Sequence, residues 1–147
     1  QTLVIGEHLS NNPDDPPEDN PSPPLPGIIK EGNTNKAGAA YIYDKKTGSW
    51  EQKRKIYSLH ETPDNEEFGS YVASYGNVVA VGARGIAGDG FVVVHEKDTA
   101  YEESLWVQRL ELTSPSALPD NFGSVALSDK RLVVGASWDD VVYIYDR

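Results

Sequence analysis

The sequence predicts an all-β fold, built from repeated sheets of short antiparallel strands. Three observations lead to this prediction. A pattern of about 54 residues recurs along the chain, each repeat contains up to four short runs rich in Val, Ile and Tyr, and no segment keeps a 3.6-residue periodicity. A chain of 147 residues is also of the size of one domain.

The first two runs of the repeat occur in a fixed order. The first begins Phe-Gly-Ser, and it is found at 68–73 and again at 122–126. The second is apolar and ends in Gly or Gly-Ala, and it is found at 3–6, 78–83 and 132–136. An almost continuous apolar run such as Val78–Val81 indicates a strand that is buried on both faces. We therefore expect the second run to lie inside a sheet.

The third and fourth runs differ from each other in polarity. The third is again apolar and is found at 38–43, 90–95 and 141–145, whereas the fourth begins with Trp and is found at 50–56 and 106–112. The fourth run carries charged residues, among them Lys53, Arg54 and Arg109. Charge of this kind is typical of an outer edge strand, where it discourages further pairing. The pattern predicts four-stranded antiparallel sheets whose central strands are covered by neighbouring sheets, as in a β-propeller.

These motifs resemble the FG-GAP repeat of integrin-alpha-type β-propellers, in particular the repeats of secreted microbial surface proteins. The resemblance implies one FG-GAP repeat region over 1–147, with about 2.5 propeller-like blades. Its parts would be an incomplete blade at 1–67, a complete blade at 68–121 and a second incomplete blade at 122–147. Some repeats of the family bind Ca²⁺ in the loop between the first and second strands. Here those loops, 74–77 and 128–131, lack the alternating oxygen ligands that Ca²⁺ requires, so we expect no cofactor.

The first repeat carries an insertion, residues 11–35, which is rich in proline and acidic residues. Proline has no backbone donor and favours extended conformations, so we expect this segment to lie outside the sheets, with 13–26 exposed. Its candidate binding residues for a partner are Pro16, Pro17, Pro23 and Pro24. The alternatives are a glycosylated or partner-docking arm and a solvated surface loop.

Few other residues suggest chemistry. Asp89, Asp139 and Asp140 are weak candidates for binding a cation, and the alternative is that they form turns. Candidate O-glycosylation sites near prolines are Ser22, Thr113, Ser114 and Ser116. The histidines have no metal-ligand spacing, and no nucleophile elbow or phosphate loop is present. We therefore expect neither a catalytic residue nor a metal centre.

Composition narrows the class of partner. There are 13 Lys and Arg against 23 Asp and Glu, for a net charge of −10, which argues against nucleic acid as a ligand. No apolar run is long enough to span a bilayer, and the absence of Cys excludes disulfides and thiolate zinc sites. Because Met is absent as well, we expect a processed product or an internal piece of a longer chain.

Together these features predict a non-enzymatic extracellular or cell-surface module for adhesion or structure. The alternatives are the propeller portion of a secreted enzyme and a Ca²⁺-dependent, glycan-binding, lectin-like module. Counting runs gives three, four and three strands, which would leave apolar faces and edges uncovered. We therefore expect self-association, or association with further blades of a parent chain, in a ring or a filament. The expected core comprises Val79, Val81, Val92, Val94, Val133, Ile144 and the ring of Phe68 or Phe122.

Overall fold

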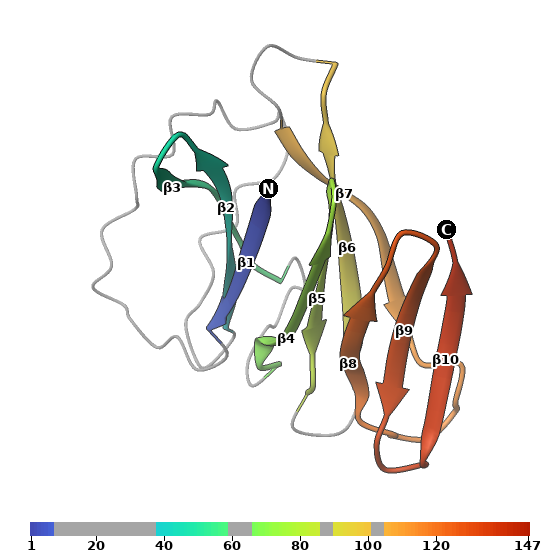
Figure 1. Cartoon of the computed structure of the whole chain (residues 1–147). Helices are drawn as coiled ribbons and strands as arrows, with labels where there is room; N and C mark the ends of the chain where they lie inside the picture. Colours follow the sequence, from blue (N-terminus) through green and yellow to red (C-terminus); the bar gives the residue numbers. More distant parts are fainter. Residues whose placement is uncertain (8–37, 59–65, 86–89, 101–104) are drawn as a thin grey trace.

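Three antiparallel β-sheets stand side by side in the computed structural model (Figure 1). The structure describes residues 1–7, 38–58, 66–85, 90–100 and 105–147. Ten strands and no helix are found in these ranges, so this part of the chain has no helix that could cross a membrane. The all-β prediction is confirmed. The three sheets do not close into a propeller.

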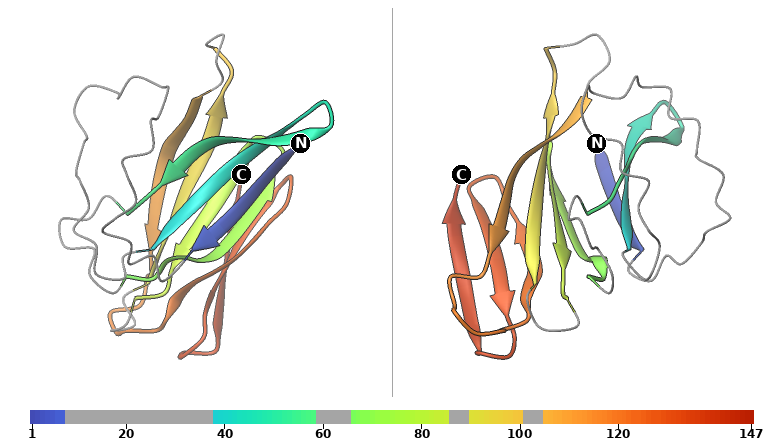
Figure 2. Two further views of the ribbon diagram at one scale, coloured as in Figure 1. Left: turned by 90° about the vertical axis from the view of Figure 1, so that its left-hand side faces the viewer. Right: turned by 180° about the vertical axis from the view of Figure 1, so that it is seen from behind.

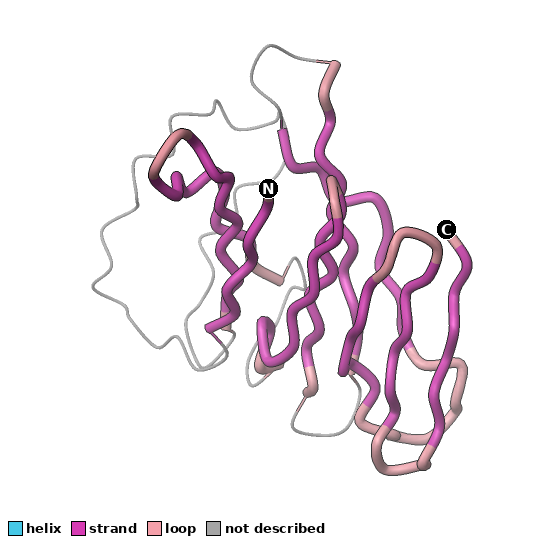
Figure 3. The backbone as a smooth tube through the Cα atoms, in the orientation of Figure 1, coloured by secondary structure: helices cyan, strands magenta, loops and turns pink. Residues whose placement is uncertain are grey.

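The first and third sheets have three strands each, and the middle sheet has four. In spatial order the first sheet contains β1 (Thr2–Glu7), β2 (Ala39–Lys46) and β3 (Ser49–Ile56). The middle sheet contains β4 (Phe68–Tyr75), β5 (Val78–Ala83), β6 (Phe91–Asp98) and β7 (Leu105–Thr113). The third sheet contains β8 (Phe122–Leu127), β9 (Arg131–Ala136) and β10 (Val141–Asp146). Each strand pairs with the next one in its sheet, as the smooth trace of Figure 3 makes plain.

The burial of the strands follows their composition. Every residue of β5 is buried, and so are the first five residues of β6, because the middle sheet has a neighbouring sheet on each face. The charged fourth runs form β3 and β7, which lie at the edges of their sheets. The predicted difference between central apolar strands and charged edge strands is therefore confirmed.

Most of the predicted core is buried, and one residue is not. Val79, Val81, Val92, Phe68 and Phe122 are completely buried, and Val94 is 8% exposed. The prediction was wrong for Ile144, which is 61% exposed, and Val133 is only partly buried. Both residues belong to the third sheet and alternate with Leu132, Val134 and Tyr143, which pack against the middle sheet. No described element covers the opposite face.

Neighbouring sheets approach each other through glycine. A Cβ atom on Gly6 of β1 would lie 1.9 Å from the carbonyl oxygen of Gly69 in β4. A Cβ atom on Gly82 of β5 would lie at the same distance, 1.9 Å, from the carbonyl oxygen of Gly123 in β8. Only a residue without a side chain allows backbones to come so close. The Phe-Gly strand of the middle sheet, β4, is thereby seated on β1, and the Phe-Gly strand of the third sheet, β8, is seated on β5.

Polar groups also join the first sheet to the middle sheet. Lys97 Nζ of β6 lies 2.5 Å from Asp44 Oδ2 of β2, and both side chains are largely buried. The guanidinium of Arg54 in β3 donates a hydrogen bond to the carbonyl oxygen of Trp106 in β7. His95 is 3% exposed, and its Nδ1 has no hydrogen-bond partner among the described residues. This interface therefore combines an apolar core with buried charge.

Candidate functional site

One face of the third sheet is apolar, and none of the described elements covers it. We call this surface the open face. Its central residues are Val133 and Gly135 of β9 and Val142 and Ile144 of β10. In the register of the sheet, Val133 is paired with Ile144, and Gly135 with Val142. Side chains alternate along a strand, so the intervening Tyr143 and Tyr145 turn to the other side and pack against the middle sheet. Burial there raises the pKa of the Tyr145 hydroxyl.

The same positions are buried in the other two sheets. Gly82 of β5, which corresponds to Gly135 in the repeat, is paired with Val92. Val92 is completely buried, whereas its counterpart Val142 is 60% exposed. In the first sheet, the counterparts of Val142 and Ile144 are residues 40 and 42, and both are completely buried. The open face therefore has the composition of an interface without the covering strand.

Gly135 also leaves space for the backbone of another strand to lie against the open face. The glycines at its position in β1 and β5 each lie against the backbone of a Phe-Gly strand. At Gly135, the nearest atom to an added Cβ is the hydroxyl oxygen of Ser124 at 2.3 Å, which belongs to the same sheet, and no backbone atom lies within 4 Å. A glycine is thus kept where the described chain has no neighbour that requires it.

Charged residues flank the open face at the two ends of β10. Asp140 precedes the strand with a φ of 53°, and Asp146 ends it, with an oxygen 3.1 Å from Nε of Arg131. Asp139 Oδ2 accepts a long hydrogen bond of 3.5 Å from the hydroxyl of Ser116. The predicted pair Asp139 and Asp140 therefore lies in the turn between β9 and β10, and no group of three metal-ligating side chains exists in the described ranges.

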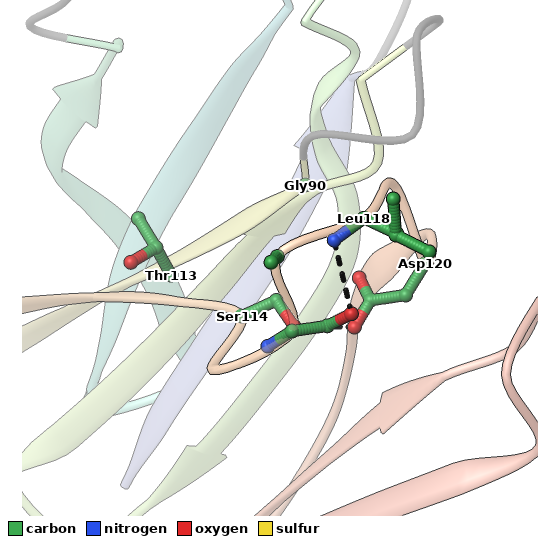
Figure 4. Close-up of a pocket in the computed structure, with 7 residues that line it drawn as sticks. Gly90, Thr113, Ser114, Leu118 and Asp120 are labelled. Atoms are coloured by element: carbon green, nitrogen blue, oxygen red, sulfur yellow. Dashed lines mark hydrogen bonds between the residues drawn. The ribbon is translucent and has the colours of Figure 1, made fainter.

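Two of the three predicted glycosylation candidates in this region have structural partners. Ser114 donates a hydrogen bond to Oδ2 of the buried Asp120 and accepts one from the amide of Ser116. Figure 4 shows Ser114 and Asp120 among the residues that line this region. Asp120 Oδ1 accepts a hydrogen bond of 3.1 Å from the amide of Phe122. Ser114, Ser116 and Asp120 line a hollow of about 150 Å³, together with Thr113, which is exposed at the end of β7. Because both carboxylate oxygens are engaged, Asp120 fixes the start of the Phe-Gly strand.

A second hollow, of about 240 Å³, is lined by Arg84 and Gly85, which follow β5, by Asn121, which precedes β8, and by Trp138, which lies after β9. We call the segment before each Phe-Gly strand, together with the end of the strand that follows it, a corner of the sheet. Arg84 is held there by Glu67, with Nη2 2.8 Å from Oε2. At the corresponding corner, the amide of Asn121 donates a hydrogen bond of 2.6 Å to the hydroxyl of Ser137. Glu67 and Asn121 both have positive φ, of 52° and 57°. In both sheets, a residue with positive φ stands just before the Phe-Gly strand, and its side chain binds a residue after the next strand. This recurrence indicates that the two corners position the Phe-Gly strands.

The remaining predicted site residues lie outside the described residues. They are Asp89 and the insertion residues Pro16, Pro17, Ser22, Pro23 and Pro24. The expectation that 11–35 stays outside the sheets therefore remains a prediction.

Comparison with known proteins identifies no relative: no family model, no curated protein and no solved structure matches this chain. The candidate site therefore stands on its geometry. Sequence reasoning assigned Ile144 to the core and so missed it as a surface residue. The strand count was the signal that could have found it, because three sheets in a row leave one face of the third sheet without a described neighbour.

Proposed function

We propose that this protein is a non-enzymatic structural or adhesion module that associates with another polypeptide through its open face, outside the cell or at its surface. The observation that carries the proposal is the exposure of Val142 and Ile144, at positions that are buried wherever a sheet follows. Contiguous exposed apolar residues on a sheet are typical of interaction surfaces.

The energetics favour burial of this face. Full burial of a Val or Ile side chain contributes about 1.5–3 kcal/mol, so two such residues supply a substantial part of an interface. Gly135 adds room for a partner backbone, as Gly6 and Gly82 do inside the chain. A sheet face of this composition is suited to packing against another sheet.

The class of function is supported by the sequence. The Phe-Gly and Val-Gly motifs resemble FG-GAP repeats, whose blades pack on one another, and this resemblance favours a surface or secreted protein. The described residues bring together no nucleophile, base and orienting group, and His95 is enclosed between sheets. The module therefore acts through binding.

Replacing Ile144 with Lys tests the proposal. We expect the wild-type chain to form larger species as its concentration rises in sedimentation-velocity experiments, and the variant to lose at least about tenfold in association constant, because a charge would be desolvated in the interface. The matched control is Leu110→Lys, at a site that is 43% exposed on the middle sheet. If the wild-type chain associates, equal association of all three proteins would contradict the proposal.

A further inference from the structure

We infer that the polypeptide that covers the open face is a second copy of this chain, which docks the outer face of its own first sheet there in a head-to-tail arrangement. The inference rests on the proposed function and names its partner.

The first sheet also has an exposed apolar face. Val4, Ile42 and Ile56 pack toward the middle sheet, so the alternate residues of the same strands turn away from it. On that outer face Leu3 is 38% exposed, Ile5 is 47% exposed and Trp50 of β3 is 42% exposed. The outer face therefore offers aliphatic and aromatic side chains to a partner, as the open face does at the other end.

The charges on the outer face are mainly positive. Lys45 Nζ lies 5.9 Å from the centre of the Trp50 ring, and Lys55 Nζ lies 5.2 Å from the centre of the Tyr41 ring. The Tyr41 hydroxyl donates a hydrogen bond of 2.8 Å to Glu7, which is the acidic residue of this face. Among the described residues of this face, two cations therefore stand beside one anion.

The charges around the open face have the opposite balance. Asp140 and Asp146 stand at the two ends of β10, in the same alternation as Val142 and Ile144, and Arg131 of β9 is paired with Asp146. Lys130 and Arg147 lie at the same end of the sheet, just outside the two strands, where the amide of Arg147 donates a hydrogen bond to the carbonyl oxygen of Lys130. Opposite charges on two surfaces favour their encounter and suppress pairing of like with like. Two open faces placed against each other would bring these aspartates together, whereas the outer face of another copy brings Lys45 and Lys55.

Because the open face and the outer face lie at opposite ends of the molecule, their contact determines how copies assemble. The first and third sheets lie on opposite sides of the middle sheet, which Figure 2 shows in two further views. A contact between different surfaces of identical chains is heterologous, and it leaves one free face of each kind after every addition. Copies would therefore add to one another until a ring closes, or would continue as a filament.

Cross-linking tests the arrangement directly, because the chain contains no cysteine. The variants Ile5→Cys and Ile144→Cys are purified separately, mixed and treated with a short bis-maleimide. We expect the product that joins residue 5 of one copy to residue 144 of another to exceed the 144–144 product by about tenfold or more. Leu110→Cys, mixed with Ile144→Cys, is the control for random collision.

Each other outcome has a definite meaning. A dominant 144–144 product would overturn the head-to-tail inference and leave the proposed function intact, because the open face would still be an interface. A wild-type chain that stays monomeric at the highest attainable concentration would also overturn it. In that case, exchange protection of 141–146 by a different polypeptide would separate failure of the inference from failure of the proposed function.

A charge variant gives an independent measurement that does not depend on cross-linking. Lys45→Glu lies on the exposed rim of the outer face, away from the core, so it is expected to fold normally. We expect this variant to have a several-fold lower self-association constant than wild type at low salt. At about 0.5 M salt the difference from wild type should be smaller, because the charges are screened. An unchanged association constant at low salt would count against the role of charge in partner choice.

Discussion

Replacing Gly82 with Ala is expected to lower the free energy of unfolding by about 3 kcal/mol, among the largest effects of a single methyl group in this protein. The added Cβ would lie 1.9 Å from the carbonyl oxygen of Gly123, and a backbone atom cannot turn aside as a side chain can. The third sheet would have to move away from the middle sheet, and the burial of Phe122 and Val92 would be disturbed.

Gly135→Ala is the matched control for this substitution, because Gly135 has the same place in the repeat. Its added Cβ would meet only the hydroxyl of Ser124, which can rotate. We expect a change below about 1 kcal/mol in the monomer, together with weaker association through the open face. Urea denaturation below the association range measures both variants. Equal losses for Gly82→Ala and Gly135→Ala would contradict the role assigned to backbone contact between sheets.

The second large effect concerns pH. Burial, and secondarily the charge of Arg54, lower the pKa of His95 from 6.5 to about 4. Between these two values the unfolded chain binds a proton that the folded chain does not bind. The free energy of unfolding is therefore expected to decrease as the pH falls from 6.5 to about 4, by roughly 3 kcal/mol from this residue.

The groups around His95 explain why protonation is unfavourable. Arg54 of β3 carries a positive charge and is itself largely buried, which lowers its pKa. The nearby Lys97 is paired with Asp44, so that carboxylate is already engaged. We expect His95→Leu to remove most of the dependence on pH in this range. Denaturation curves at a series of pH values measure the difference in free energy of unfolding between the wild type and His95→Leu. Contributions from His8 and His60 cancel in this difference, because both proteins contain these residues. An unchanged slope in the variant would assign the effect to other groups.

The strands were accessible to sequence reasoning because the repeat presents each of them two or three times. Val78–Ala83 was expected as a buried strand, and it is β5 with the same bounds. The charged edge strands followed from the polarity of the fourth runs in the same way. Local composition decides these features, so one sequence is enough to predict them.

The exposure of the third sheet was harder to predict from composition. Ile144 and Val94 stand at the same place in the repeat, and both belong to apolar runs. Only the arrangement of whole sheets separates them, since Val94 has β8 against it and Ile144 has no described neighbour on that face. The contacts made by Gly6 and Gly82 likewise depend on where the next sheet lies, although the recurring Val-Gly sequence marked their positions.

The seating of each Phe-Gly strand on the preceding sheet has a consequence for how the protein unfolds. The middle sheet has a neighbour on each face, whereas each outer sheet has one sheet packed against it among the described elements. The coupling therefore runs between nearest neighbours along a row. Partial opening is then expected to begin at an outer sheet. Amides of β9 and β10 should exchange with solvent sooner than those of β5 and β6, and they should become protected when a partner covers the open face. The rate of amide exchange in the third sheet would therefore show whether a partner is bound to the open face.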